Sequence, residues 1–394
     1  MSIAQVTLAT VAIFAGAALL DRLAARLRMP ATLFYLLAGF AVSEGLVAYG
    51  IDLGIRWYHF NDVVVNVLVP IVVATSVLTL GRKRLVHSIR MLCGTSMWLV
   101  CLTIPVTAAV VFFAIDHPTG FPWLAAFVAA SCFAATDPGA LKPEHETPGV
   151  TATSDALEAE STAGDVIAVS AFSILVAGYM KMGAAFDLSA LATAIGWSLI
   201  GGCAVGTVFG LSGSALTHLL NHRDTSVAVL PLAVTLGAFL FCQNFGVGSG
   251  AIAALVTGLI LASQSRDANV SSQALVNAIG WCARVLVFVL AGVTVTRFMF
   301  VDQWLAMLVA IAAATAARWF VIRLGGTVMG AGGRQLDAEA RAQLMFGGGR
   351  GCLVLALALS LPLDFEGWYT IQSMAYGLVL FSLIVHPLLL RRDY

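Results

Sequence analysis

The sequence predicts an all-α polytopic membrane protein with about 13 transmembrane helices, and three observations support this fold class. Of the 394 residues, 60% are hydrophobic and 11% are charged, against about 25% charged in an ordinary soluble domain. The mean hydropathy is +0.93. The apolar runs are long and continuous and lack the alternation of membrane β-strands. This composition excludes a soluble enzyme, a disordered chain and a nucleic-acid binder with a basic face.

Each apolar run is assigned to one helix, and short polar connections separate the runs. In chain order we expect helices at approximately 3–20, 31–49, 61–80, 91–115, 122–140, 155–180, 188–211, 225–243, 247–263, 275–296, 303–323, 340–361 and 370–390. No basic segment precedes the first run, so we expect a retained span and not a cleaved signal peptide. The connections leave no room for a soluble domain, so we expect one transmembrane domain over residues 1–394.

The distribution of basic residues predicts the orientation. Fifteen of the 21 Lys and Arg residues lie in the odd-numbered connections and the C-terminal tail, and three lie in the even-numbered connections. Because basic residues collect on the cytoplasmic side, we expect the N-terminus outside and the C-terminus in the cytoplasm.

The sequence carries no pattern typical of a cofactor site or an enzyme. The seven cysteines lie in apolar runs without a CxxC pair or a neighbouring His cluster, so we expect buried thiols, not disulfides or metal ligands. HExxH, GxSxG and GxGD-like patterns are missing from the sequence. We therefore expect a protein that is not an enzyme and binds no cofactor.

The fifth run contains Thr136, Asp137 and Pro138. Proline lacks an N–H and disfavours helix at the residue before it, so we expect the helix to break near Thr136 and Asp137. Inside a membrane, freed backbone groups are tolerated only where they line a cavity or bind something. The alternative is a capped helix end near the membrane surface, with Asp137 in water.

The sixth run contains an acidic residue that cannot easily be moved to a surface. Asp155 and Glu158 have the spacing of an N-cap and its capping partner. A helix that begins there places Asp165 about 15 Å deep, near the middle of the hydrocarbon layer. Ser161 lies one turn earlier on the same face. A hydroxyl, a carboxylate and freed carbonyls would form an all-oxygen cation site; the alternative is a buried helix–helix hydrogen bond.

The twelfth run contains Arg350 within the sequence Gly347-Gly348-Gly349-Arg350-Gly351. Four glycines in five residues weaken a helix severely. Arg350 is too deep for comfortable snorkelling, so we expect it to meet a buried acid or the negative ends of broken half-helices. The two broken runs are seven spans apart and therefore cross the membrane in opposite directions. This pattern is typical of inverted repeats with two discontinuous crossed helices. We expect Asp137 at half-helix N-termini and Arg350 at half-helix C-termini.

Four motifs together resemble one known family, the monovalent cation/proton antiporters of the NhaP/NHE-type branch. Ala135-Thr136-Asp137-Pro138 resembles its "ATDP" segment. Glu160-Ser161-x-x-Gly164-Asp165 resembles its "ES-x-x-ND" motif. Gly349-Arg350-Gly351 with Leu355–Pro362 resembles its "LRG…LALALSLP" segment, and Val247–Ala253 resembles its "VSGxxA" helix start. The order and spacing match over nearly the whole chain.

The resemblance implies a thirteen-span homodimer that works by elevator-like alternating access. It implies a core bundle at approximately 91–180 and 303–390, and dimerisation helices at approximately 1–80 and 188–296. We expect it in the lipid bilayer of a bacterial inner (plasma) membrane. The implied substrates are H⁺ and a monovalent cation, Na⁺ first and K⁺ or Li⁺ as possible ions.

The resemblance also implies roles for six residues. Asp165 would bind either the cation or H⁺, and Ser161 and the Thr136 carbonyl would complete the cation coordination. Asp137 would organise the site, and Glu160 would form a buried ion pair with Arg350. Because a single carboxylate titrates while Arg350 stays charged, we expect electroneutral 1:1 exchange.

The sequence departs from the family pattern in two places. Gly164 stands where the family has Asn or Asp, and the third run has Thr75 and Ser76 where members often carry an acid. Two other functions therefore remain open. One is a sodium-coupled symporter of an organic anion, which the acids beside the break disfavour. The other is a non-transporting sensor that keeps the fold.

Overall fold

The computed structural model describes residues 3–50, 58, 60–79, 97–115, 121–137, 152–182, 188–220, 225–264, 270–329, 345–346 and 348–392. All the regular elements in these ranges are helices. They are α1 (Ile3–Leu27), α2 (Ala31–Ala48), α3 (Asn61–Val63), the π-helical η2 (Val64–Leu68), α4 (Val69–Thr79), α6 (Met97–Ala114), α7 (Trp123–Ala134), α8 (Ala152–Met182), α9 (Leu188–Leu219), α10 (Thr225–Phe245), α11 (Gly250–Gln264), α12 (Val270–Thr294), α13 (Arg297–Asp302), α14 (Trp304–Met329), α16 (Cys352–Leu359) and α17 (Trp368–Arg392).

The observed helices agree with the predicted runs. Each of the thirteen predicted ranges contains a helix in the described part of the chain. Among the described residues, seven helices are long and apolar enough to cross a membrane by length and composition, and five further apolar helices are shorter. The prediction of an all-α architecture is confirmed, and the number of membrane crossings stays a prediction.

Several helix ends differ from the predicted ones. α1 continues to Leu27 and α9 to Leu219, beyond the predicted ends at 20 and 211. α8 begins at Ala152, so Asp155 lies within the helix and the prediction that it is the N-cap is wrong. Hydrophobicity marks where the hydrocarbon ends, whereas good helix formers such as Ala, Leu and Arg extend a helix past that boundary.

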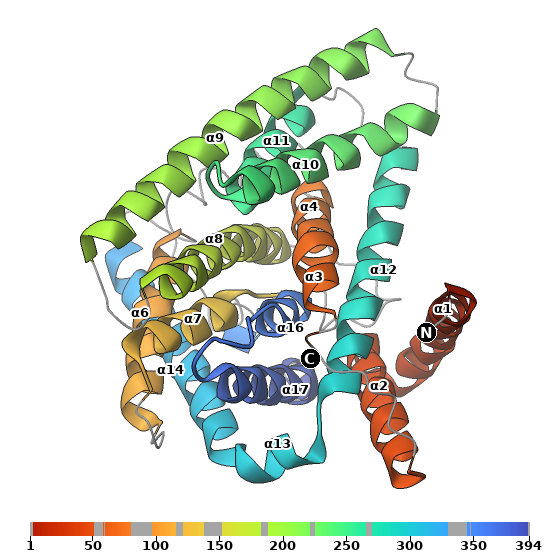
Figure 1. Cartoon of the computed structure of the whole chain (residues 1–394), viewed down its shortest axis with the longest axis vertical. Helices are drawn as coiled ribbons and strands as arrows, with labels where there is room; N and C mark the ends of the chain where they lie inside the picture. The colour runs from red at the N-terminus through yellow and green to blue at the C-terminus, as the bar shows by residue number, and fades with distance from the viewer. Residues whose placement is uncertain are drawn as a thin grey trace.

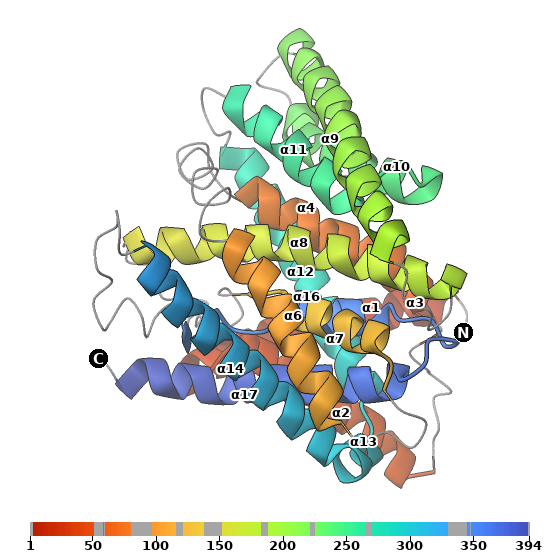
Figure 2. The same ribbon diagram turned by 90° about the vertical axis from the view of Figure 1, so that its left-hand side faces the viewer.

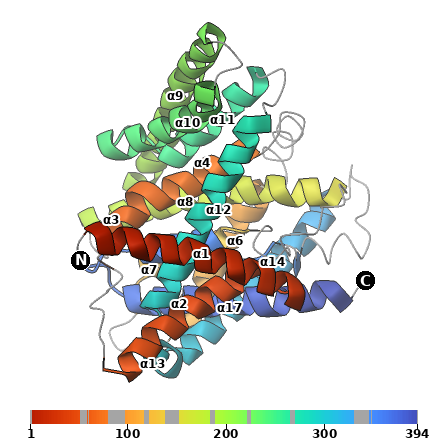
Figure 3. The same ribbon diagram turned by 90° about the vertical axis from the view of Figure 1, so that its right-hand side faces the viewer.

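The helices pack in two groups around α8. α6, α7, α14, α16 and α17 lie on one side, and α7 and α16 lie between α8 and α17 (Figures 1 and 2). α4, α9, α10 and α11 lie on the other side, and α12 runs past both groups, in contact with α4, α10 and α16. α1 and α2 pack beside α12 (Figure 3). The division into a core bundle and dimerisation helices stays a prediction.

A close backbone contact joins α12 to α2, and one buried polar contact holds the second group against α8. A Cβ atom on Gly292 would lie 2.2 Å from the Leu36 carbonyl oxygen, so α12 and α2 touch through their backbones. The hydroxyls of Ser170 on α8 and Ser249, which precedes α11, lie 2.7 Å apart and are buried. α8 is therefore fixed between the interrupted helices on one side and α4 and α11 on the other.

Candidate cation site at two interrupted helices

The first interrupted helix is α7. It ends at Ala134, and Ala135 is extended with φ −60° and ψ 136°. The predicted span to residue 140 is therefore too long as a helix, although the predicted break near Thr136 and Asp137 is confirmed. Pro138, the residue that predicted the break, lies outside the described residues. The early end leaves carbonyl groups of the last turn without partners in their own helix.

The second interrupted helix is α16. The chain is non-helical over residues 348–351, and α16 covers only Cys352–Leu359. The prediction of one span over 340–361 is therefore corrected to a short half-helix preceded by a non-helical segment. A Cβ atom on Gly348 would lie 2.5 Å from the Arg318 guanidinium, so a side chain at this position would have to displace the guanidinium. Gly347 lies outside the described residues.

The two interruptions cross and satisfy each other. The Asp137 backbone N–H donates to the Gly349 carbonyl over 2.6 Å. The Arg350 guanidinium donates to the carbonyls of Ala134 and Ala135, over 2.9 and 3.0 Å. The Cys352 N–H at the start of α16 faces the Asp137 carboxylate at 3.5 Å. Each of these hydrogen bonds joins two residues that are about 215 positions apart in the chain, so the partners come from the protein itself.

This crossing places each charge at the helix end that suits it. The C-terminus of a helix carries partial negative charge and the N-terminus partial positive charge. Arg350, which is 4% exposed, lies at the C-terminal end of α7. Asp137 lies at the N-terminal end of α16. The expectation that these residues balance the half-helix ends is confirmed.

Asp165 lies beside the crossing, near the middle of the 31-residue helix α8. Its side chain is 6% exposed. Oδ2 is 3.5 Å from the Ser76 hydroxyl of α4, and Oδ1 has no hydrogen-bond partner among the described residues. Buried carboxylate oxygens are usually paired. The free oxygen is therefore a position where a proton or a cation can bind.

The other predicted site residues lie on the segments beside this carboxylate. The Ser161 hydroxyl donates to the Thr136 carbonyl, which joins α8 to the broken end of α7. The Thr136 backbone and the charges of Asp137 and Arg350 lie within electrostatic reach of Asp165. Five of the six predicted site residues therefore lie together. The side chain of the sixth, Glu160, lies outside the described residues, so its ion pair with Arg350 stays a prediction.

Sequence reasoning did not assign Ser76 to the site. Its hydroxyl lies 3.3 Å from the Thr162 hydroxyl and contacts Asp165. Its place in the third run, where the family pattern often has an acid, was the signal that could have found it. Gly164 also faces the site, because a Cβ atom there would lie 3.8 Å from Thr136 Oγ1. Among the residues that depart from the family pattern, Ser76 thus contacts the carboxylate and Gly164 faces Thr136.

Comparison with known proteins identifies the family. The sequence pattern of the family described as "Sodium/hydrogen exchanger, transmembrane" matches residues 9–392. The chain belongs to this family. Within the sodium/hydrogen exchangers, it is similar to the Na(+)/H(+) antiporter NhaH of Halobacillus dabanensis, with 29% identity over 349 residues that cover 84% of this chain and 82% of that protein. NhaH of Halobacillus aidingensis is 27% identical over 342 residues, with the same coverage.

A solved exchanger structure shares the fold. The sodium proton antiporter MjNhaP1 from Methanocaldococcus jannaschii at pH 8 matches with a TM-score of 0.78 and 19% identity, over 98% of this chain and 100% of that chain. At this identity the likeness shows the fold alone. The predicted antiporter fold is confirmed, and the exchanger is an integral membrane protein.

The crossing predicts a large effect of Arg350→Ala on stability. The substitution leaves two buried carbonyls without donors, and each costs about 1–3 kcal/mol. We expect the free energy of unfolding to fall by about 2–6 kcal/mol, measured as a lower melting temperature of the purified protein in detergent. Arg323→Ala is the control, because Arg323 is exposed on α14 and its guanidinium lies 5.1 Å from the centroid of the Trp319 ring. Equal melting temperatures for the two variants would contradict this account of the crossing.

Proposed function

We propose that this chain is a secondary-active antiporter that exchanges a monovalent cation, Na⁺ first, for H⁺ at Asp165. The observation that carries the proposal is the Asp165 carboxylate itself. It is buried near the middle of a long helix, and one of its oxygens has no partner among the described residues. Ionisable residues at such depth are costly and mark ion pathways. The names of the curated relatives, which are Na(+)/H(+) antiporters, support the choice of ions.

We assign the cation to three oxygen ligands from two segments. These are the Asp165 carboxylate, the Ser161 hydroxyl and the Thr136 backbone carbonyl, a set that suits a hard cation. In the structure the Ser161 hydroxyl donates its proton to the Thr136 carbonyl. Binding of a cation would turn this hydroxyl so that its lone pair, and the freed carbonyl, face the ion. Asp137 organises the site by holding the start of α16.

Competition for one carboxylate explains obligatory exchange. A cation at Asp165 expels the proton, and a proton neutralises the charge that attracts the cation. Either occupant removes the bare charge, so both loaded forms can change their exposure across the membrane. The empty, charged form crosses poorly because a bare carboxylate in the membrane is unfavourable. The single titrating carboxylate gives 1:1 electroneutral stoichiometry.

The remaining features of the proposal come from the family resemblance. The core bundle would move like an elevator against the dimerisation helices of a homodimer. The protein would lie in a bacterial inner membrane, with its N-terminus outside and its C-terminus in the cytoplasm. Glu160 would pair with Arg350 to hold α8 against the crossing.

Asp165→Asn tests the proposal, because it removes the titrating charge and keeps the shape of the side chain. We expect cation-dependent proton movement in proteoliposomes to be lost, tested with Na⁺, K⁺ and Li⁺ at several pH values. The melting temperature should not fall, because a buried charge is removed. The matched control is Asp302→Asn, an exposed acid at the end of α13, which should transport like the unmodified protein. Exchange at the unmodified rate in Asp165→Asn would place the site elsewhere, and no exchange with any cation in the folded unmodified protein would favour the sensor.

Voltage tests the stoichiometry independently. The membrane potential of proteoliposomes would be clamped with K⁺ and valinomycin between 0 and about −120 mV. We expect the rate and direction of Na⁺-driven proton movement to stay the same over this range. If each cycle moved one net charge, about −120 mV would shift the driving force by about 2.8 kcal/mol. A rate that changes steeply with potential would contradict the scheme with one carboxylate and one cation.

A further inference from the structure

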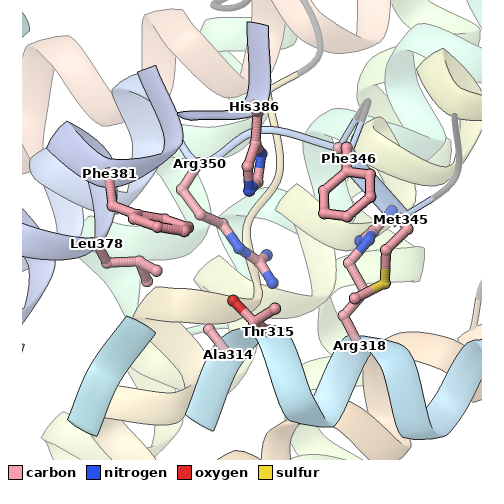
Figure 4. A pocket seen from close by; sticks show the side chains of 10 residues that line it. Ala314, Thr315, Arg318, Met345, Phe346, Arg350, Leu378, Phe381 and His386 are labelled. Carbon is pink, nitrogen blue, oxygen red and sulfur yellow. The ribbon is translucent and has the colours of Figure 1, made fainter. Parts of the chain in front are cut away.

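A polar cluster on the far side of Arg350 from α7 has no part in the cation site. It lies in a small pocket between α14, α17 and the non-helical segment, lined by Arg350, Arg318, Phe346, Phe381 and His386, among others. Figure 4 shows His386 above the Arg350 side chain, with Phe346 and Phe381 on either side. His386 is 8% exposed, so its ring nitrogens must find partners within the protein.

A chain of two hydrogen bonds connects His386 to the backbone of Arg350. The Arg350 N–H donates to Ser382 Oγ over 2.8 Å. Ser382 Oγ in turn lies 3.3 Å from His386 Nδ1, one helical turn further along α17. The hydroxyl has already accepted one hydrogen bond, and the described residues offer its proton no other acceptor. The Ser382 hydroxyl therefore donates to Nδ1, and the ring proton of the neutral imidazole lies on Nε2.

The other contacts of the ring reach the same segment from its opposite end. The rings of Phe346 and Phe381 each meet the imidazole edge-on, with centroids 5.8 Å away. The imidazole thus ties both Phe346 and Arg350 to α17, on the two sides of the glycines. A charged imidazole would add a third positive group beside Arg350 and Arg318, which agrees with the neutral form that the hydrogen bonds require.

This link acts on a part of the chain that has little rigidity of its own. Successive glycines leave the backbone before Arg350 with many accessible conformations. The guanidinium must nevertheless hold the Ala134 and Ala135 carbonyls at hydrogen-bond distance, and Thr136 follows them directly. We propose that His386 is a positioning residue for Arg350, acting through the Ser382 hydroxyl, and thereby aligns the Thr136 carbonyl with Asp165. The effect on ion binding rests on the proposed exchange function, whereas the effect on the crossing does not.

The first experiment measures the crossing without transport. Cys352 is 2% exposed at the start of α16, so its alkylation by a maleimide requires the crossing to open. In a protein that retains Cys352 as its single cysteine, Ser382→Ala and His386→Phe should each raise the labelling rate about fivefold, the loss of roughly one net hydrogen bond. The double variant should be no faster than either single variant, because both remove the same link.

Two controls separate this link from general loosening. Ser373→Ala removes another buried serine of α17, whose hydroxyl bonds within its own helix to the Tyr369 carbonyl, and should leave Cys352 labelling unchanged. A protein with Cys132 alone, buried inside α7, should keep its slow labelling in every variant. His386→Asn, which retains an acceptor near the Nδ1 position, should restore slow labelling of Cys352. Equal rates for Ser382→Ala and Ser373→Ala, or a parallel rise at Cys132, would overturn the proposal.

The second experiment measures the effect of the same substitutions on the apparent affinity for Na⁺. In proteoliposomes, Ser382→Ala and His386→Phe should raise the half-saturating Na⁺ concentration about fivefold, without further change in the double variant. A folding defect would lower the maximum rate instead. If the unmodified protein shows no exchange, the proposed function fails while Cys352 labelling still decides the role of His386. Multiplicative effects of the two substitutions would show that they act separately and would overturn the link.

Discussion

A helix that is interrupted inside a membrane must find partners for its freed backbone groups, and the site of this protein depends on how the chain meets that requirement. Water is missing from the hydrocarbon layer, so partners must come from the protein. Here two interrupted helices supply them to each other. Arg350 donates to the last carbonyls of α7, and Asp137 faces the first N–H of α16. The crossing is therefore neutralised by residues on the opposite segments.

Because the two interrupted helices supply hydrogen-bond partners to each other, Asp165 differs from the other charged residues at the crossing. Asp137 and Arg350 are both committed to helix ends, whereas one oxygen of Asp165 has no partner in the described part of the chain. The same crossing joins the Thr136 carbonyl to the Ser161 hydroxyl, which lies one helical turn before Asp165. One set of contacts thus satisfies the backbone at the two breaks and joins the segments that carry the cation ligands that we propose. Beyond the site, the Arg350 backbone N–H also has a partner on another helix, because it donates to the Ser382 hydroxyl, which in turn contacts His386.

The sequence predicted the features that depend on local chemistry. Long apolar runs predicted the helices, Pro138 and the glycines around Arg350 predicted the two breaks, and depth alone singled out Asp165. The features that the sequence predicted wrongly or missed depend on contacts between residues that are far apart in the chain. α7 ends at Ala134, where the Arg350 guanidinium caps its last carbonyls, and not at residue 140 as predicted. Ser382 could not be recognised, because a serine in an apolar helix most often bonds to its own backbone, as Ser170 and Ser373 do here.

The central claim is that one carboxylate holds either the cation or the proton, and proton release on cation binding tests it most directly. Purified protein in weakly buffered detergent would be titrated with NaCl while a pH indicator reports protons and ²²Na⁺ reports binding. Choline chloride controls for ionic strength. At a pH at which the sodium-free site is protonated, the account predicts one proton released for each Na⁺ bound, and neither event in Asp165→Asn. Saturable Na⁺ binding that releases no proton at any pH, or release that persists in the variant, would contradict it.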